Sequence, residues 1–106
     1  MTTSQHIIKI LDEKKAKEIK LFDLKDKNYL VDEAIVATSL NEKHSLSLVD
    51  SLKEGLKPLG EEFLRVDDGQ GWIVIDLGDK LIHIMIDEYR QRYDMDQFLQ
   101  SFKASS

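Results

Sequence analysis

A two-residue turn at Gly78-Asp79 constrains this sequence most, because it joins two β-rich segments, 72–77 and 80–86. A glycine followed by a short polar residue is typical of a primed turn, whose twist matches that of the flanking strands. Since a turn of fixed length also fixes the register, the cross-strand pairs follow directly. They are Leu77 with Lys80, Asp76 with Leu81, Ile75 with Ile82, Val74 with His83, Ile73 with Ile84, and Trp72 with Met85.

The two faces of this hairpin differ in composition, because side chains alternate along a strand. One face is aliphatic apart from Lys80 at the turn, and this composition predicts a core face. It consists of Ile73, Ile75, Leu77, Ile82, Ile84 and Ile86. The other face is too apolar for a solvated surface and too polar for a core. It consists of Trp72, Val74, Asp76, Leu81, His83 and Met85.

Two interpretations of the mixed face are open. A second layer of the same protein covers it, since a sheet can be packed on both faces, or it is an exposed patch that binds a partner. Tryptophan and methionine are enriched at protein interfaces, and tryptophan is a frequent hot spot. The predicted partner-binding residues are Trp72, Val74, Asp76, Leu81, His83 and Met85, with Arg90 and Tyr93 at the rim.

Composition bounds the class of protein. The chain has 106 residues, which predicts one domain over 1–106 with a polar tail over 101–106. It contains no cysteine, so disulfides and thiolate metal sites are excluded. No apolar run has the length of a membrane span, and the first residues lack a signal-peptide pattern. We therefore expect a cytoplasmic protein with no membrane partner.

The charge balance bears on the kind of partner. Acidic residues number 20 and basic residues 15, which gives a formal net charge of −5. Binding to duplex nucleic acid requires clustered lysine and arginine, so we expect none. A basic protein partner fits an acidic chain better, because complementary charge speeds encounter.

Periodicity and capping residues predict the element order α-β-β-α-β-β-β-α. The first half is expected to contain a helix over 4–17 capped by Ser4, a strand over 19–24 closed by a polar cluster at 25–28, and a buried strand over 34–38. A helix over 42–57 follows, capped by Asn41, with its apolar positions at Leu46, Val49, Leu52 and Leu56, and after it come a strand over 63–66, a turn over 67–71 and the hairpin. The chain is expected to end with a short helix over 88–93 capped by Asp87 and a last helix from 94, which begins with a capping box of Asp94 and Gln97 and carries Phe102. The segments 34–38, 42–57 and 63–66 are expected to form a right-handed βαβ unit. The predicted fold is a small α/β domain, a mixed sheet flanked by helices.

Residue chemistry gives little sign of catalysis. His83 lies diagonal to Asp76, and a carboxylate–imidazole pair can serve as a general base, but no nucleophile lies nearby in the sequence. His83, Asp76 and Asp79 lack the compact spacing of a metal site. Phosphate-binding glycine loops are absent from the sequence. We expect no catalytic, cofactor or metal residues, and the pattern favours a binding module.

The segment from the hairpin onward resembles the ribosomal silencing factor family, also called Iojap-related proteins. The matching residues are Trp72, Asp76, Gly78, Asp79, His83, Glu88, Arg90, Tyr93 and the pair Met95-Asp96. A second match runs from Leu30 through Ala37-Thr38 to the pair Lys43-His44. The chain departs from the family pattern at Ser39, where glycine is usual, and at Phe98-Leu99, where the family ends Leu-Trp.

The resemblance implies a nucleotidyltransferase-like fold without the enzymes' catalytic groups. Those enzymes carry Gly-Ser at a helix start and two aspartates two residues apart on a strand. This chain has Thr38-Ser39 instead, and Asp23 has no second aspartate at that spacing. The implied role is to bind large-subunit ribosomal protein fourteen, to keep the small subunit from joining when nutrients are short, and to act in late large-subunit assembly. A nucleotidyltransferase-fold enzyme, an Asp-His hydrolase and a generic homodimer joined through the mixed face are the alternatives.

Overall fold

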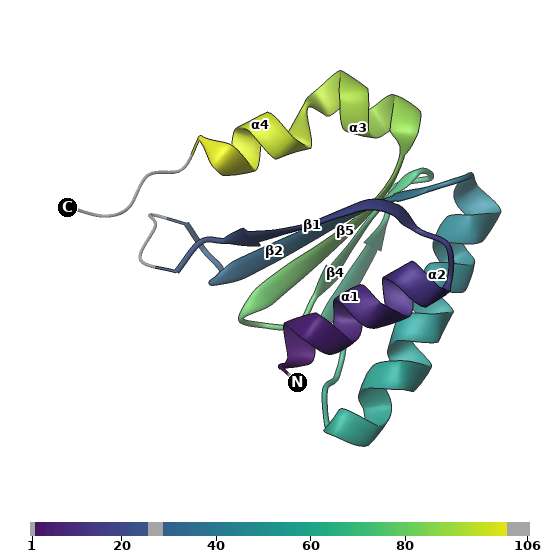
Figure 1. Cartoon of the computed structure of the whole chain (residues 1–106), viewed down its shortest axis with the longest axis vertical. Helices are drawn as coiled ribbons and strands as arrows, with labels where there is room; N and C mark the ends of the chain where they lie inside the picture. Colours follow the sequence, from purple (N-terminus) through teal and green to yellow (C-terminus); the bar gives the residue numbers. More distant parts are fainter. Residues whose placement is uncertain (1, 26–28, 102–106) are drawn as a thin grey trace.

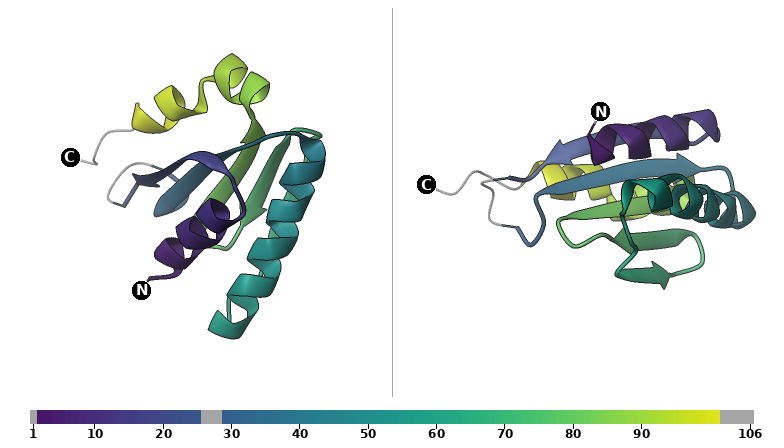
Figure 2. Two further views of the ribbon diagram at one scale, coloured as in Figure 1. Left: turned by 45° about the vertical axis from the view of Figure 1, so that its right-hand side comes forward. Right: turned by 90° about the horizontal axis from the view of Figure 1, so that it is seen from below.

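The computed structural model describes residues 2–25 and 29–101, where a five-stranded sheet lies between helices on both faces (Figures 1 and 2). The strands are β1 (Lys17–Asp23), β2 (Glu33–Ser39), β3 (Arg65–Asp68), β4 (Trp72–Asp76) and β5 (Lys80–Ile86). They are arranged in the order β1-β2-β5-β4-β3. The neighbours β2 and β5 are parallel, and the other neighbouring pairs are antiparallel. The predicted mixed α/β sheet is confirmed.

The helices form one layer on each side of this sheet (Figure 2). They are α1 (Thr3–Glu13), α2 (Glu42–Leu56), α3 (Asp87–Tyr93) and α4 (Met95–Gln100), with a 3-10 turn over Lys57–Leu59. Helices α1 and α2 cover one face, and α3 and α4 cover part of the other. Of the predicted polar segments 25–28 and 101–106, only Lys25 and Ser101 lie within the described residues. No helix in the described ranges is long and apolar enough to cross a membrane.

The hairpin between β4 and β5 has the predicted register. Its pairs run from Trp72 opposite Met85 to Asp76 opposite Leu81, and the backbone N–H of Leu77 donates to the carbonyl of Lys80 at 3.0 Å. Gly78 has a φ of 98°, which a primed turn with glycine in the first position requires. The turn length therefore determined the pairing, as the sequence predicts.

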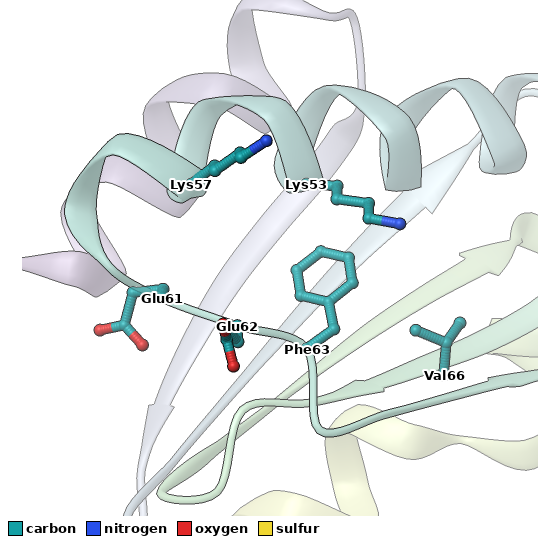
Figure 3. Close-up of a pocket in the computed structure, with 6 residues that line it drawn as sticks. All are labelled: Lys53, Lys57, Glu61, Glu62, Phe63 and Val66. Atoms are coloured by element: carbon teal, nitrogen blue, oxygen red, sulfur yellow. The ribbon is translucent and has the colours of Figure 1, made fainter.

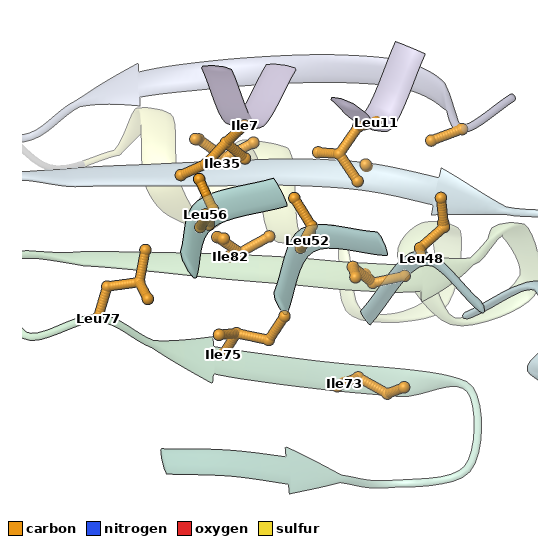
Figure 4. Packing of buried hydrophobic residues seen from close by; sticks show 13 residues of the cluster. Ile7, Leu11, Ile35, Leu48, Leu52, Leu56, Ile73, Ile75, Leu77 and Ile82 are labelled. Carbon is orange, nitrogen blue, oxygen red and sulfur yellow. The ribbon is translucent and has the colours of Figure 1, made fainter. Parts of the chain in front are cut away.

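The aliphatic face of the hairpin forms the main core with α1 and α2 (Figure 4). Ile75, Ile82 and Ile84 are fully buried. Full burial of one such side chain contributes about 1.5–3 kcal/mol, so this layer fixes the sheet against the helices. The helices contribute Ile7, Leu11, Leu48, Leu52 and Leu56.

Helix α2 begins as predicted, because the side chain of Asn41 accepts a hydrogen bond from the backbone N–H of His44 at 2.8 Å. Its apolar stripe differs from the prediction in one residue. Leu48 is fully buried, whereas Leu46 is 51% exposed. Leu48 lies four residues before Leu52 and eight before Leu56, so helical spacing places it on their stripe, whereas Leu46 lies off that stripe.

The first helix is shorter than predicted. Thr2, not Ser4, caps it, and Gln5 completes a capping box. At the other end the N–H groups of Lys15 and Ala16 donate to the carbonyls of Asp12 and Leu11, the pattern of a Schellman motif. Lys15 takes the left-handed position with a φ of 74°. Because glycine usually occupies that position, the helix end was missed, and β1 begins earlier, at residue 17.

The two strands of the predicted βαβ unit, β2 and β3, run parallel but are not neighbours in the sheet. Strand β3 covers 65–68 rather than 63–66, and the predicted turn over 67–71 shortens accordingly. Strands β2 and β3 are separated in the sheet by β5 and β4. The parallel neighbour of β2 is β5, because the whole β4–β5 hairpin is inserted beside β2.

The predicted aspartate cap is wrong for α3, whereas at α4 the predicted residue holds the N-cap position without the cap hydrogen bond. Asp87 is the first residue of α3, after Ile86 at the N-cap. Asp94 takes a left-handed conformation with a φ of 46°, and its side chain makes no cap hydrogen bond with any described residue. The chain bends at this residue between α3 and α4 (Figure 1), and α4 packs over β2 and β5. Phe102, predicted on this helix, lies outside the described residues.

Candidate functional site

The mixed face of the hairpin is divided into a covered half and an open half. Over β2 and β5, Met95 and Leu99 of α4 form a second core cluster with Leu81 and Met85. Within this half, a second layer of the same protein covers the sheet. The first of the two interpretations therefore holds here.

Three of the predicted interface residues lie in the covered half. Leu81, His83 and Met85 are exposed by only 9%, 5% and 0%. The prediction that they form the apolar centre of a surface is corrected, because the C-terminal helices lie over them. Alternation along a strand shows which residues share a face, but not which later segment folds onto that face.

Arg90 was predicted at the rim of the interface, and it is instead buried, with 4% exposure. Its Nε and Nη2 atoms each donate to the Asp96 carboxylate at 2.9 Å. Its Nη1 atom donates to the carbonyl oxygen of Glu18 and to the Thr38 hydroxyl, both at 2.7 Å. The guanidinium is directed into the fold and is not part of the open surface.

The open half contains the remaining predicted residues, Trp72, Val74, Asp76 and Tyr93. The first three are half-buried on β4, and Tyr93 at the end of α3 is 51% exposed. The rings of Trp72 and Tyr93 lie with their centroids 5.1 Å apart, within the range of favourable aromatic pairs. This pair forms the apolar end of the open surface.

Strand β3 extends the open surface with polar side chains. Arg65 lies opposite Asp76, and Asp67 lies opposite Val74, so these residues share the face. The Nε atom of Arg65 donates to Asp67 at 3.1 Å. Sequence reasoning missed both residues because it placed Asp67 in a turn and gave the strand that contains Arg65 no pairing with the hairpin. We call this set the hairpin-edge surface: Trp72, Val74, Asp76, Tyr93, Arg65 and Asp67.

His83 supports the hairpin-edge surface from below. The indole Nε1 of Trp72 donates to Nδ1 of His83 at 3.1 Å, which requires the proton of the neutral imidazole to be on Nε2. That Nε2 atom is buried and has no hydrogen-bond partner among the described residues. Burial lowers the pKa of His83 to about 4, so the ring is neutral at pH 7.

The side chains that a catalytic interpretation would use have structural partners. Asp76 accepts from the backbone N–H of Gly78 at 2.8 Å and does not hydrogen-bond to His83. The hydroxyl of Ser39 pairs with that of Ser45, and Thr38 accepts from Arg90. In the part of the chain that the structure describes, no three histidine, aspartate or glutamate side chains are grouped as metal ligands.

A groove that the sequence did not predict lies between α2 and β3 (Figure 3). Its volume is about 460 Å³. Val66 pairs with Ile75, so the groove opens on the α2 side, opposite the hairpin-edge surface. Its lining residues are Lys53, Lys57, Glu61, Glu62, Phe63 and Val66.

Fold and site together define a small α/β protein with an exposed amphipathic surface over β4 and β3, at one edge of its sheet. Two solved structures have the same fold. A protein from Chromobacterium violaceum superposes with a TM-score of 0.86 at 27% identity, covering 97% of this chain and 88% of that one. A protein from Bacillus halodurans superposes with a TM-score of 0.78 at 25% identity, covering 90% of each chain.

The chain belongs to the family described as ribosomal silencing factor during starvation, which matches residues 2–105. The ribosomal silencing factor of Haemophilus influenzae is 29% identical over 102 residues, covering 92% of this chain and 97% of the relative. That of Chromobacterium violaceum is 27% identical over 95 residues, covering 88% and 78%. Membership gives the chain a ribosome-associated, translation-repressing role, and the resemblance read from the hairpin residues is confirmed.

Proposed function

We propose that this protein binds the large ribosomal subunit through large-subunit ribosomal protein fourteen and blocks the joining of the small subunit. Translation is repressed because the two subunits cannot meet. The proposal places the protein in the cytoplasm, includes a role in late large-subunit assembly, and involves neither duplex nucleic acid nor a membrane. Family membership supports it.

The hairpin-edge surface is the proposed contact, and the stacked pair of Trp72 and Tyr93 is the observation that carries this assignment. Tyr93 is 51% exposed although its ring is large and apolar. Exposed aromatic residues surrounded by polar groups are the usual composition of interface hot spots. The chain's net charge of −5 also favours a basic partner.

The proposed action is steric and involves no turnover. The described chain measures 41 × 34 × 21 Å, and a standard interface covers about 800 Å² on each partner. Most of the body therefore projects from the surface to which it binds. A nucleotidyltransferase or hydrolase activity is disfavoured, because the hydroxyls of Thr38 and Ser39 are engaged in structural hydrogen bonds and fold alone does not confer activity.

We also propose that the same surface joins two copies of the chain weakly when no ribosome is present. Arg65 and Asp67 lie side by side on this surface, so a second copy can present the opposite charge to each. Binding to the ribosome then competes with self-association, because both use the aromatic pair.

Co-sedimentation of the purified protein with isolated large and small subunits tests the proposal. Trp72→Glu and Tyr93→Glu each introduce a charge at the aromatic pair, where loss of an anchor costs about 2 kcal/mol or more of binding energy. We expect the unchanged protein to sediment with large subunits and not with small subunits. Both variants should remain in the supernatant.

Leu46→Glu is the matched control, because Leu46 is also 51% exposed but lies on α2, across the sheet from the hairpin-edge surface. It should bind as the unchanged protein does. If both surface variants have an unaltered circular dichroism spectrum and still bind large subunits, the surface is assigned wrongly. If the unchanged protein does not bind large subunits, the proposed function is wrong.

A further inference from the structure

Arg90 joins three elements that are distant in the sequence. It lies on α3 and contacts Asp96 of α4, Thr38 of β2 and the backbone of Glu18 in β1. A buried guanidinium is unfavourable unless its donors are satisfied, and these contacts satisfy Nε, Nη1 and Nη2. The planar fork suits the bidentate contact with a carboxylate, which lysine cannot reproduce.

The carboxylate of Asp96 is adapted to this contact. The hydrogen bond from Arg90 holds the pKa of Asp96 below its usual value, so the carboxylate is charged at pH 7. Lys20 of β1 adds a second cation at 3.4 Å. The C-terminal helices are therefore attached to β1 by charge as well as by the apolar contacts of Met95 and Leu99.

The backbone of β1 is shaped to meet Arg90. Its pairing with β2 shifts register between Lys17 and Lys20, which marks a bulge. Glu18 within this bulge has a φ of 48°. A left-handed conformation at a non-glycine residue is strained and persists where surrounding contacts impose it. Here the carbonyl oxygen of Glu18 accepts from Arg90 at 2.7 Å.

Helix α3 depends on such contacts for its position. It has seven residues and no side-chain cap at Ile86, and helices this short are not stable in isolation. One side of α3 directs Arg90 into the fold. Tyr89 and Tyr93, four residues apart, form an aromatic row that continues to Trp72, with centroid distances of 6.0 Å and 5.1 Å.

We infer that Arg90 is a positioning residue for the proposed ribosome-binding surface. Its contacts fix α3 on the sheet, so that Tyr93 stacks on Trp72 before the partner arrives. The expected effect on binding affinity rests on the proposed function. The placement of Tyr93 does not, because it can be measured without a ribosome. A surface that is ordered in advance binds more tightly because less conformational freedom is lost on binding.

Fluorescence provides the direct measurement, because Trp72 is the single tryptophan of the chain. Arg90→Lys keeps the charge and loses the fork, and Asp96→Asn keeps the shape and loses the charge. Both should shift Trp72 emission to longer wavelength and increase its quenching by acrylamide, with an unchanged circular dichroism spectrum. Both should also weaken binding to large subunits about tenfold.

Two variants serve as controls. Arg92→Lys alters a neighbouring arginine whose contact with Glu88 is exposed. Glu88→Gln removes the charge of the other partner of that exposed ion pair and matches Asp96→Asn in chemistry. Neither should change the fluorescence or the binding. If Arg90→Lys does not fold, Asp96→Asn carries the test alone.

The outcomes separate the inference from the proposed function. Unchanged emission and quenching in the folded Arg90 or Asp96 variant would overturn the positioning role, whatever the binding result. A fluorescence change with unaltered binding would overturn the link between positioning and affinity. A fluorescence change in variants of a protein that never binds large subunits would support positioning and refute the proposed function instead.

Discussion

At the scale of single residues, His83 shows how a polar side chain is retained beneath an aromatic surface. Its ring accepts the indole hydrogen of Trp72, which fixes the tryptophan's orientation without placing a charge in the interior. Nδ1 can accept this hydrogen bond only while the imidazole is neutral, and burial lowers the pKa of His83 to about 4. The residue is thus a structural support whose protonation state matters to the surface above it.

This pKa shift predicts a loss of stability in mild acid. The unfolded chain has a histidine pKa of about 6.5 and the folded chain one of about 4, so between these values the unfolded state binds more protons. The free energy of unfolding should therefore fall as the pH is lowered from about 6.5 to about 4, by about 3 kcal/mol, and level off below. Urea unfolding at several pH values measures this.

The control is His83→Asn, whose amide oxygen stands near the position of Nδ1 and can accept from Trp72 but does not titrate. Carboxylates titrate in both proteins, so the difference between the two curves isolates His83. The difference between the two curves should change by about 3 kcal/mol between pH 6.5 and pH 4 and stay constant above and below that range. Parallel curves over the whole range would contradict the assignment.

At the scale of elements, the sequence predicted correctly those features that depend only on residues close together in the chain. The β4–β5 hairpin was predicted pair by pair, because a two-residue turn allows one register. The end of α1 was not predicted because Lys15 occupies the left-handed position after the helix, where glycine is usual. Strand order across the sheet was not predicted, since periodicity gives no information on which strands become neighbours.

The candidate site was predicted only in part for the same reason. The sequence identified Trp72 and Tyr93, which the structure places together. It also assigned Met85 and Arg90 to the surface, and both are buried. Both are buried by contacts with α4, which packs on Met85 and pairs its Asp96 with Arg90, and no local pattern in the sequence indicates where that helix lies.

The end of α1 gives a prediction for an element. Lys15 has a φ of 74°, which costs a residue with a Cβ about 1 kcal/mol or more. Lys15→Gly should remove that strain at a smaller entropic cost in the unfolded chain, and so raise the free energy of unfolding by about 0.5 kcal/mol or more. Thermal and urea unfolding both report it.

Lys14→Gly is the comparison, because Lys14 at the helix end has a φ of −94° and no such strain to relieve. It should be neutral or destabilising. If Lys15→Gly is as destabilising as Lys14→Gly, the Schellman ending of α1 does not govern stability there.

At the scale of the whole molecule, the proposed function predicts stoichiometric competition. Two ligands that exclude one another on the large subunit must weaken each other's binding by the same factor. A body of 41 × 34 × 21 Å seated near the joining surface occupies space that the small subunit needs. Joining should therefore fall in proportion to the factor added and reach its minimum near one copy per large subunit.

The order in which factor and small subunits are added distinguishes steric occlusion from active splitting of whole ribosomes. Excess small subunits should displace the factor from large subunits, and whole ribosomes formed beforehand should resist it, because their joining surface is already covered. Sucrose-gradient profiles over a titration of the factor measure both effects. Splitting of whole ribosomes by far less than one copy each would require turnover, and unchanged joining at saturating factor would place the bound protein away from the joining surface. Either result would refute occlusion, whereas occlusion predicts a one-to-one end point that excess small subunits reverse.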